Sequence, residues 1–317
     1  MRSILATLLL AVPAAAADTP ATFPDLPKPI SSFGATVCDG YVYVYGGHSG
    51  KVHSYSADTT LNTFHRISIA TPTKWEELPG GKHLQGLSLV EHAGNVIRVG
   101  GMEPKHKAGE KSDISSTASV QRFDPKTKKW SDLPDLPAPR SSHDAAIVGD
   151  TLVVIGGWAM AAGKGPEWVS DTLTLNLADP KAKWVSVKQP FVRRALSVAA
   201  VDGKVYAVGG LLESGGTDHS VSVFDPKSGK WSESVKLPGG RMNAFTPAVI
   251  AAGGKLYANP ADGDLYRLAG DKWEHVATVK AARYVHRMVP LPGGKLLVIG
   301  GASKDGVRAS CEVVGGR

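Results

Sequence analysis

Basic residues recur along the chain at positions that could recognise an anion. They are Lys82, Arg140, Arg193, Arg241 and Arg283, and each lies 16 to 18 residues before a doublet that closes an apolar segment. Guanidinium and ammonium groups gathered in a concave, partly desolvated site bind carboxylates and other anions. If the repeated segments form a circle, we expect a basic ring. Alternatively, each side chain pairs with a nearby carboxylate or loop carbonyl.

Two histidines accompany this pattern. His143 and His286 each lie three residues after an arginine, Arg140 and Arg283 respectively, so we count them with the ligand-facing set. No carboxylate or cysteine lies beside them at the spacing of a metal site, and no metal is predicted.

The sequence shows no pattern of catalytic groups. It lacks a nucleophile elbow, a His-Glu-x-x-His pair and a phosphate-binding loop, so we predict no catalytic residues and no cofactor. The net charge of +7 is spread along the chain without a run of Lys or Arg, which argues against nucleic acid as a partner. The 36 glycines and 21 prolines indicate a folded chain rich in tight turns.

The elements that position these residues are short apolar strands closed by a glycine doublet. The doublets are Gly46-Gly47, Gly100-Gly101, Gly156-Gly157, Gly209-Gly210 and Gly300-Gly301. Neighbouring doublets lie 53 to 56 residues apart, except for a last interval of 91 that leaves room for a hidden repeat. We assign that repeat to Lys255–Tyr257 followed by Ala258-Asn259.

A tryptophan follows five of the six repeated strands at a longer distance. The tryptophans are Trp75, Trp130, Trp184, Trp231 and Trp273. The sixth is missing, and Phe23 replaces it by spacing, because Leu26-Pro27 follows Phe23 as Leu78-Pro79 follows Trp75. We expect both the glycines and the aromatic residues to be structural, the glycines where neighbouring sheets converge and the aromatics nearer the rim.

The set of markers resembles the kelch family of β-propellers over roughly residues 20–317. The resemblance implies an all-β, six-bladed propeller of four-stranded antiparallel blades. We expect an N-terminal strand around residues 21–23 to close the ring by pairing with a strand around residues 307–314. The loops that lead into each first strand and join strands two and three then share one face, and the basic residues surround the mouth of the central channel. The second-to-third connections are long in the first three blades, which is typical of binding elements.

Two kinds of function fit this fold. The first is a binding module, acting on an anionic glycan, a small anionic ligand, an acidic peptide or a protein. The second is a carbohydrate enzyme, since the architecture is shared with the sialic-acid mutarotases. Galactose oxidase also has a kelch domain, but Cys38 and Cys311 lie inside apolar strands, which argues against its cross-linked copper site.

The N-terminus resembles a signal peptide. Arg2 precedes an apolar run over residues 4–12 and four alanines at 14–17, which predicts cleavage after Ala17. We therefore expect residues 1–17 to be a signal peptide and residues 18–317 to form an exported monomer, periplasmic or secreted, with no transmembrane segment. In such a compartment Cys38 and Cys311 could form a disulfide or remain free.

Overall fold

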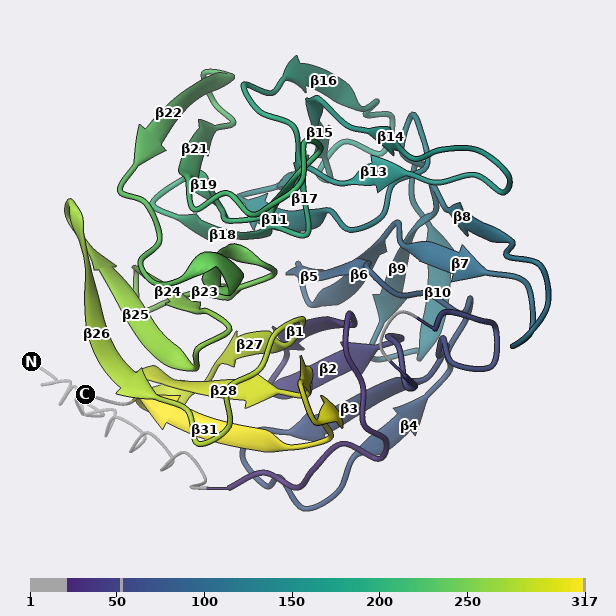
Figure 1. The fold of residues 1–317 in the computed structure, drawn as a ribbon, viewed down its shortest axis with the longest axis horizontal. Helices are drawn as coiled ribbons and strands as arrows, with labels where there is room; N and C mark the ends of the chain where they lie inside the picture. Colours follow the sequence, from purple (N-terminus) through teal and green to yellow (C-terminus); the bar gives the residue numbers. More distant parts are fainter. Residues whose placement is uncertain (1–21, 52–53, 316–317) are drawn as a thin grey trace, which may run out of the picture.

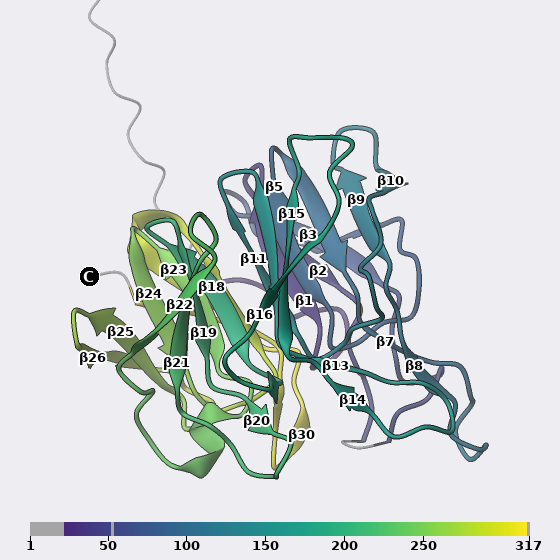
Figure 2. The same ribbon diagram turned by 90° about the horizontal axis from the view of Figure 1, so that it is seen from above.

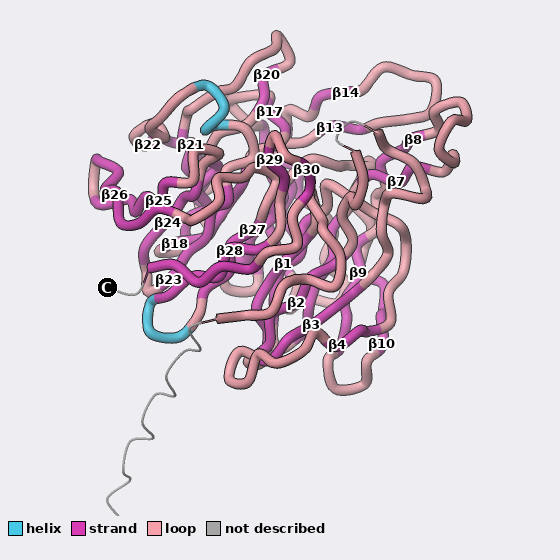
Figure 3. Tube along the Cα trace, turned by 60° about the horizontal axis from the view of Figure 1, so that its bottom comes forward, coloured by secondary structure: helices cyan, strands magenta, loops and turns pink. Residues whose placement is uncertain are grey.

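The computed structural model describes residues 22–51 and 54–315, and within them nearly all regular structure is β-strand (Figure 3). The strands form six antiparallel sheets, or blades, arranged around a central channel (Figure 1). Five of the sheets have four strands, and the sixth has three among the described residues. The prediction of a six-bladed propeller is confirmed.

The strands of each blade follow one another from the channel outward. Blade one contains β1 (Gly34–Cys38), β2 (Tyr41–Tyr45), β3 (Phe64–Ser68) and β4 (Glu76–Leu78). Blade two contains β5 (Ser88–His92), β6 (Asn95–Val99), β9 (Val120–Asp124) and β10 (Lys129–Asp132). Blade three contains β11 (Asp144–Val148), β12 (Thr151–Ile155), β15 (Asp171–Asn176) and β16 (Val185–Lys188). Blade four contains β18 (Ser197–Val201), β19 (Lys204–Val208), β21 (Val221–Asp225) and β22 (Lys230–Ser234). Blade five contains β23 (Ala248–Ala252), β24 (Lys255–Asn259), β25 (Asp264–Ala269) and β26 (Lys272–Thr278). Blade six contains β27 (Arg287–Pro290), β28 (Lys295–Ile299) and β31 (Cys311–Gly315).

Short two-stranded pairings extend the blades on one side of the ring (Figure 2). They are β7 (Met102–Pro104) with β8 (Ile114–Ser116), β13 (Trp158–Ala159) with β14 (Glu167–Trp168), β17 (Arg193–Arg194) with β20 (Leu211–Leu212), and β29 (Ala302–Ser303) with β30 (Gly306–Val307). We call this side the hairpin face. It carries the long second-to-third connections, as predicted. The two described helices, η1 (Arg241–Ala244) and η2 (Pro292–Gly294), are single 3-10 turns, and no described helix could cross a membrane.

The glycine doublets lie where one blade meets the next. Gly157 has φ +97°, and a Cβ built there would lie 2.6 Å from the carbonyl oxygen of Ser141. Its N–H donates to the carbonyl of Arg193 in blade four at 2.9 Å. A side chain would be unfavourable on both counts, because neither the left-handed conformation nor the close approach tolerates a Cβ. The approach of the two blades therefore favours glycine at this position.

Each outer-strand tryptophan packs between its own blade and the preceding one. Trp130 of blade two contacts Tyr45 and Phe64 of blade one, and its indole N–H donates to the carbonyl of Pro79 at 2.8 Å. Trp75, Trp184 and Trp273 also donate to backbone carbonyls, whereas the Trp231 indole has no described partner. These side chains lie at the rim ends of the interfaces, as the spacing predicted.

The N-terminal segment closes the ring, but differently from our expectation. Residues 22–26 form no strand, and the segment is held to blade six by backbone hydrogen bonds that include Leu26 N–H to Ala309, Ile30 N–H to Arg308 and Gly301 N–H to Ile30. Phe23 does not take the tryptophan's place between blades five and six. It packs with Trp75 between blades six and one instead. Ala21 and the predicted signal peptide lie outside the described residues.

The hidden repeat and the cysteines also differ in detail from the other repeats. Blade five exists as assigned, but β24 runs through Asn259, so Ala258-Asn259 end the strand and do not follow it. Cys38 and Cys311 are both free. Burial raises the pKa of each thiol to about 12, so neither is a reactive thiolate near neutral pH.

Candidate functional site

A ring of left-handed residues surrounds the channel on the hairpin face. In every blade the residue two positions before the innermost strand has a positive φ, between 45° and 59°. These residues, which we call the collar, are Ser32, Gly86, Ser142, Ala195, Thr246 and Val285. The conformation costs a non-glycine residue roughly 1–2 kcal/mol. Five of six collar positions are not glycine, so the surrounding structure imposes the conformation.

Hydrogen bonds connect the collar from blade to blade. Gly86 N–H donates to Ser32 O at 2.7 Å, and Ser142 N–H to Gly86 O at 2.8 Å. The series continues through Ala195, Thr246 and Val285 and returns to Ser32, with every link between 2.7 and 3.0 Å. In one link the acceptor is the hydroxyl of Thr246, which takes the N–H of Val285. The collar is thus a closed circuit of six hydrogen bonds.

An ion pair crosses the channel behind the collar. Asp144 and Arg287 are the first residues of the innermost strands of blades three and six, which face each other, and their side chains meet at 2.9 Å. Arg287 also donates to the carbonyls of Phe33 and Leu87. Asp144 accepts further hydrogen bonds from the Ser88 hydroxyl and a backbone N–H of blade four. Groups from five blades therefore converge on this pair.

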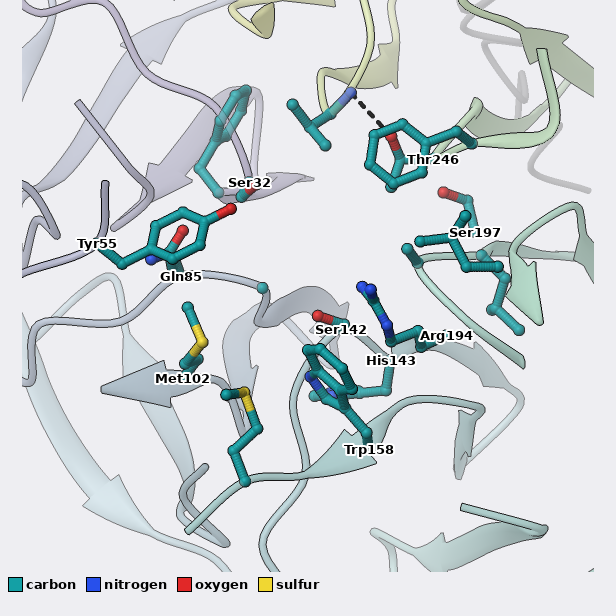
Figure 4. Close-up of a pocket in the computed structure, with 18 of the residues that line it drawn as sticks. Ser32, Tyr55, Gln85, Met102, Ser142, His143, Trp158, Arg194, Ser197 and Thr246 are labelled. Atoms are coloured by element: carbon teal, nitrogen blue, oxygen red, sulfur yellow. Dashed lines mark hydrogen bonds between the residues drawn. The ribbon is translucent and has the colours of Figure 1, made fainter. Parts of the chain in front are cut away.

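A cavity of about 370 Å³ opens above this ion pair on the hairpin face. All six collar residues line it, and side chains from the hairpins and the 46–60 connection form its wall (Figure 4). Apolar atoms make up most of the exposed wall. Besides the collar, the wall is formed by Phe33, Tyr55, Gln85, Met102, Ile114, His143, Trp158, Met160, Arg194, Leu196, Ser197, Leu211, Phe245, His286 and Arg287.

Among the described residues that line this cavity, Arg194 is the charged side chain without a hydrogen-bonded or ionic partner. Its guanidinium lies 3.8 Å from the ring centroid of Trp158 and 5.3 Å from that of Trp168, and Figure 4 shows it directed into the cavity. It makes no hydrogen bond or ion pair with any described residue, and its Nε is buried without a partner. Burial lowers its pKa from the ordinary value of 12.5, but an arginine stays protonated at neutral pH. The aromatic rings orient the guanidinium and leave its donors available.

The two predicted histidines lie at the inner end of the cavity. His143 and His286 each immediately follow a collar residue, and they are 3% exposed. Burial, with the positive charges of neighbouring arginines, lowers the pKa of each to about 3. His286 Nε2 bonds to Asn259, whereas neither ring nitrogen of His143 has a partner among the described residues. Both rings are neutral near pH 7. No cluster of three potential metal ligands exists in the described residues.

The predicted basic ring does not exist at the channel mouth. Arg140, Arg193 and Arg283 are buried inside their blades, with exposures of 2%, 0% and 1%. Arg140 pairs with Asp171 at 2.6 Å, and Arg193 donates to the carbonyls of Gly209 and Ser220. Arg283 donates to the carbonyls of Gly300 and Ser310. The alternative that these side chains pair with carboxylates and loop carbonyls is therefore correct.

The predicted register of Lys82 and Arg241 is wrong. The N–H of the second glycine of each doublet donates to a carbonyl of the next blade, four residues before the innermost strand of that blade begins. This residue is Leu84 in blade two and Ala244 in blade five. Lys82 and Arg241 lie two and three residues earlier and are exposed. Neither lines the cavity. Lys82 lies 18 residues before Gly100, which is the longest spacing of the series and indicated that Lys82 is not equivalent to the other basic positions.

Arg194 is the functional candidate that sequence reasoning missed. It directly follows Arg193, and the two alternate along β17, so Arg193 enters the blade while Arg194 faces the cavity. The signal was the basic pair itself, because neighbouring residues of a strand point to opposite sides. Gln85 and Phe245 lie at the matching positions of their blades and also line the cavity.

Comparisons with known proteins support the repeat assignment. Residues 29–80, 99–137 and 193–238 match the Kelch motif. The chain superposes on a solved structure of YjhT with a TM-score of 0.73, over 92% of this chain and 99% of that one, at 14% identity. The motif matches and the structural similarity both indicate a β-propeller.

The chain is a six-bladed β-propeller that carries Kelch motifs.

Curated kelch proteins match part of this propeller. Mouse Kelch-like protein 35 is 27% identical over 210 residues, which cover 66% of this chain and 31% of that protein. Beta-scruin of Limulus polyphemus is 23% identical over 220 residues, covering 68% of this chain and 22% of that protein. Bovine Kelch-like protein 36 is 30% identical over 189 residues, 57% of this chain and 30% of that protein. The matched regions thus span less than a third of these relatives.

Proposed function

We propose that this kelch propeller is a binding module that holds a small anionic ligand in the cavity on its hairpin face. The observation that carries the proposal is the Arg194 guanidinium, which is oriented by two tryptophans, directed into the cavity and without a described acceptor. A cation in a concave, partly desolvated site favours an anion strongly. The strained collar beneath it supports the same assignment, because such strain concentrates at functional sites.

The sugar mutarotase alternative is less well supported by the same cavity. Opening and closing a sugar ring requires a proton donor and acceptor with a pKa near the working pH. No described residue that lines the cavity is a carboxylate, and the two lining histidines have pKa values of about 3. Measurement of anomer exchange by NMR separates the two functions: a binder leaves the exchange rate of a sugar acid unchanged.

The binding function is tested by thermal denaturation with a panel of small anions and their neutral analogues. We expect anions to raise the Tm of the wild type, and Arg194→Gln to lose that increase. Lys230→Gln is the matched control, because it removes one exposed positive charge from the outer strand β22. An equal anion-induced increase in Arg194→Gln and the wild type would remove the proposal.

We further propose that the propeller acts as an exported monomer after cleavage behind Ala17, as residues 1–17 predict. N-terminal sequencing of the protein recovered from a periplasmic or culture fraction tests the cleavage. Size-exclusion chromatography with light scattering tests the monomer. Recovery of the chain with Met1 intact in the cytoplasmic fraction alone would contradict export.

A further inference from the structure

The wall of the cavity combines one charged group without a partner, Arg194, with many apolar side chains. The wall also carries thioether and aliphatic side chains: Met102, Met160 and Ile114 line the cavity, and Leu211 lies beside Arg194 on the paired strand. Figure 4 shows Met102 and Tyr55 across the cavity from Arg194. Thioethers fill irregular apolar space and pack well against aromatic groups. One charge therefore faces an apolar wall.

Several polar groups of the wall are already occupied. Arg287 is held by Asp144 and two carbonyls, and the Thr246 hydroxyl accepts the N–H of Val285. His286 Nε2 bonds to Asn259, and the Gln85 amide lies 3.4 Å from the Thr60 hydroxyl. A ligand with a hydroxyl on nearly every carbon would bury many of them against apolar side chains, which is unfavourable without hydrogen bonds.

From this arrangement we propose that the ligand is an amphipathic monocarboxylate: one carboxylate on Arg194, carried by an aromatic or branched-aliphatic body that packs on the methionine-rich wall. The inference rests on the proposed function and narrows its substrate class. Arginine presents paired donors that match a carboxylate in a bidentate arrangement. Because Trp158 and Trp168 already orient the guanidinium, little side-chain freedom is lost on binding. The cavity volume of about 370 Å³ suits a small ligand of this kind.

The test is titration calorimetry of the full chain with three ligands: 3-phenylpropionate, its neutral amide 3-phenylpropanamide, and glucuronate. We expect the wild type to bind 3-phenylpropionate at least tenfold more tightly than either of the others. Comparison with the amide measures what the negative charge contributes to affinity. Comparison with glucuronate measures what the apolar body contributes. Both comparisons use the unaltered protein, so they decide the proposal even where a variant folds poorly.

Two variants locate the effect. Arg194→Gln is expected to bring the affinities for the acid and the amide to within about twofold of each other. Met160→Gln keeps the charge and side-chain length but makes the wall polar, and it should weaken the phenylpropionate affinity about three- to tenfold. Lys230→Gln should change neither.

The outcomes separate the two proposals. Tight binding of glucuronate with none of 3-phenylpropionate would overturn the amphipathic ligand class and leave the anion-binding function standing. Binding of neither acid, nor of any anion in the thermal panel, to a folded wild type would overturn both. Equal affinity of the wild type for 3-phenylpropionate and its amide would also reject the carboxylate contact.

Discussion

Asp144 and Arg287 form a 2.9 Å ion pair across the central channel, although 143 residues separate them in the sequence. The carboxylate is 6% exposed and the guanidinium 22%. Removal of one member leaves the other charge without its partner, which is costly in a buried site. We expect Asp144→Asn to lower the free energy of unfolding by about 3 kcal/mol, measured by urea denaturation.

A double-mutant cycle isolates the pair from its other contacts. Combining Asp144→Asn with Arg287→Met should destabilise less than the sum of the two single changes, because the second change removes the charge that the first left unpaired. Strict additivity would show that the two side chains do not interact in solution.

Trp130 should be the most sensitive of the rim aromatics. It contacts Tyr45, Phe64 and Phe123 and bonds to the Pro79 carbonyl. We expect Trp130→Ala to cost about 3–5 kcal/mol, because truncation of a large aromatic side chain leaves a cavity between two blades. Trp130→Phe keeps most of the packing and should cost less. A Tm for Trp130→Ala equal to that of the wild type would contradict the assignment.

Two glycines with nearly the same φ allow the cost of a positive φ to be compared with the cost of a steric clash. Gly209 has φ +70° and Gly229 has φ +69°, but a Cβ at Gly209 would lie 2.6 Å from the carbonyl oxygen of Ala244, whereas a Cβ at Gly229 meets nothing within 4 Å. Gly229→Ala should cost roughly 1–2 kcal/mol, which is the cost of the left-handed conformation. Gly209→Ala should cost clearly more. Equal losses in urea denaturation would disprove the close approach between blades.

The buried histidines predict a pH dependence of stability. His143 and His286 have folded pKa values of about 3, against 6.5 for the free side chain. Below pH 6.5 the unfolded chain therefore binds protons that the folded chain does not, so stability falls as the pH decreases toward 3. Each histidine contributes a slope of up to about 1.4 kcal/mol per pH unit.

The measurement is urea denaturation between pH 6.5 and 5, above the range in which ordinary carboxylates titrate. Replacement of His143 by Gln should reduce the slope of the unfolding free energy against pH by the contribution of one histidine, up to about 1.4 kcal/mol per pH unit. His275→Gln is the control, because this histidine is exposed on the outer strand β26. An unchanged slope in His143→Gln would mean that this ring is protonated in the folded protein.

The sequence revealed the repeats and the shared face of the long loops, because glycine doublets and tryptophans recur wherever blades meet. It did not reveal which basic residue faces the cavity. Arg193 and Arg194 are neighbours of the same type, and only the placement of β17 beside the collar decides which of them enters the blade. Likewise, Phe23 matches Trp75 in spacing, yet it packs at a different interface because residues 22–26 form no strand.

The collar has a consequence for how specificity could change. Its six links pass from each blade to the next and return to the start, five through the backbone and one through the Thr246 hydroxyl, so the aperture at the base of the cavity is set by the number of blades. Residues in the hairpins can vary without widening that base. New ligand preferences are therefore most accessible through exchange of hairpin residues on an aperture of constant diameter.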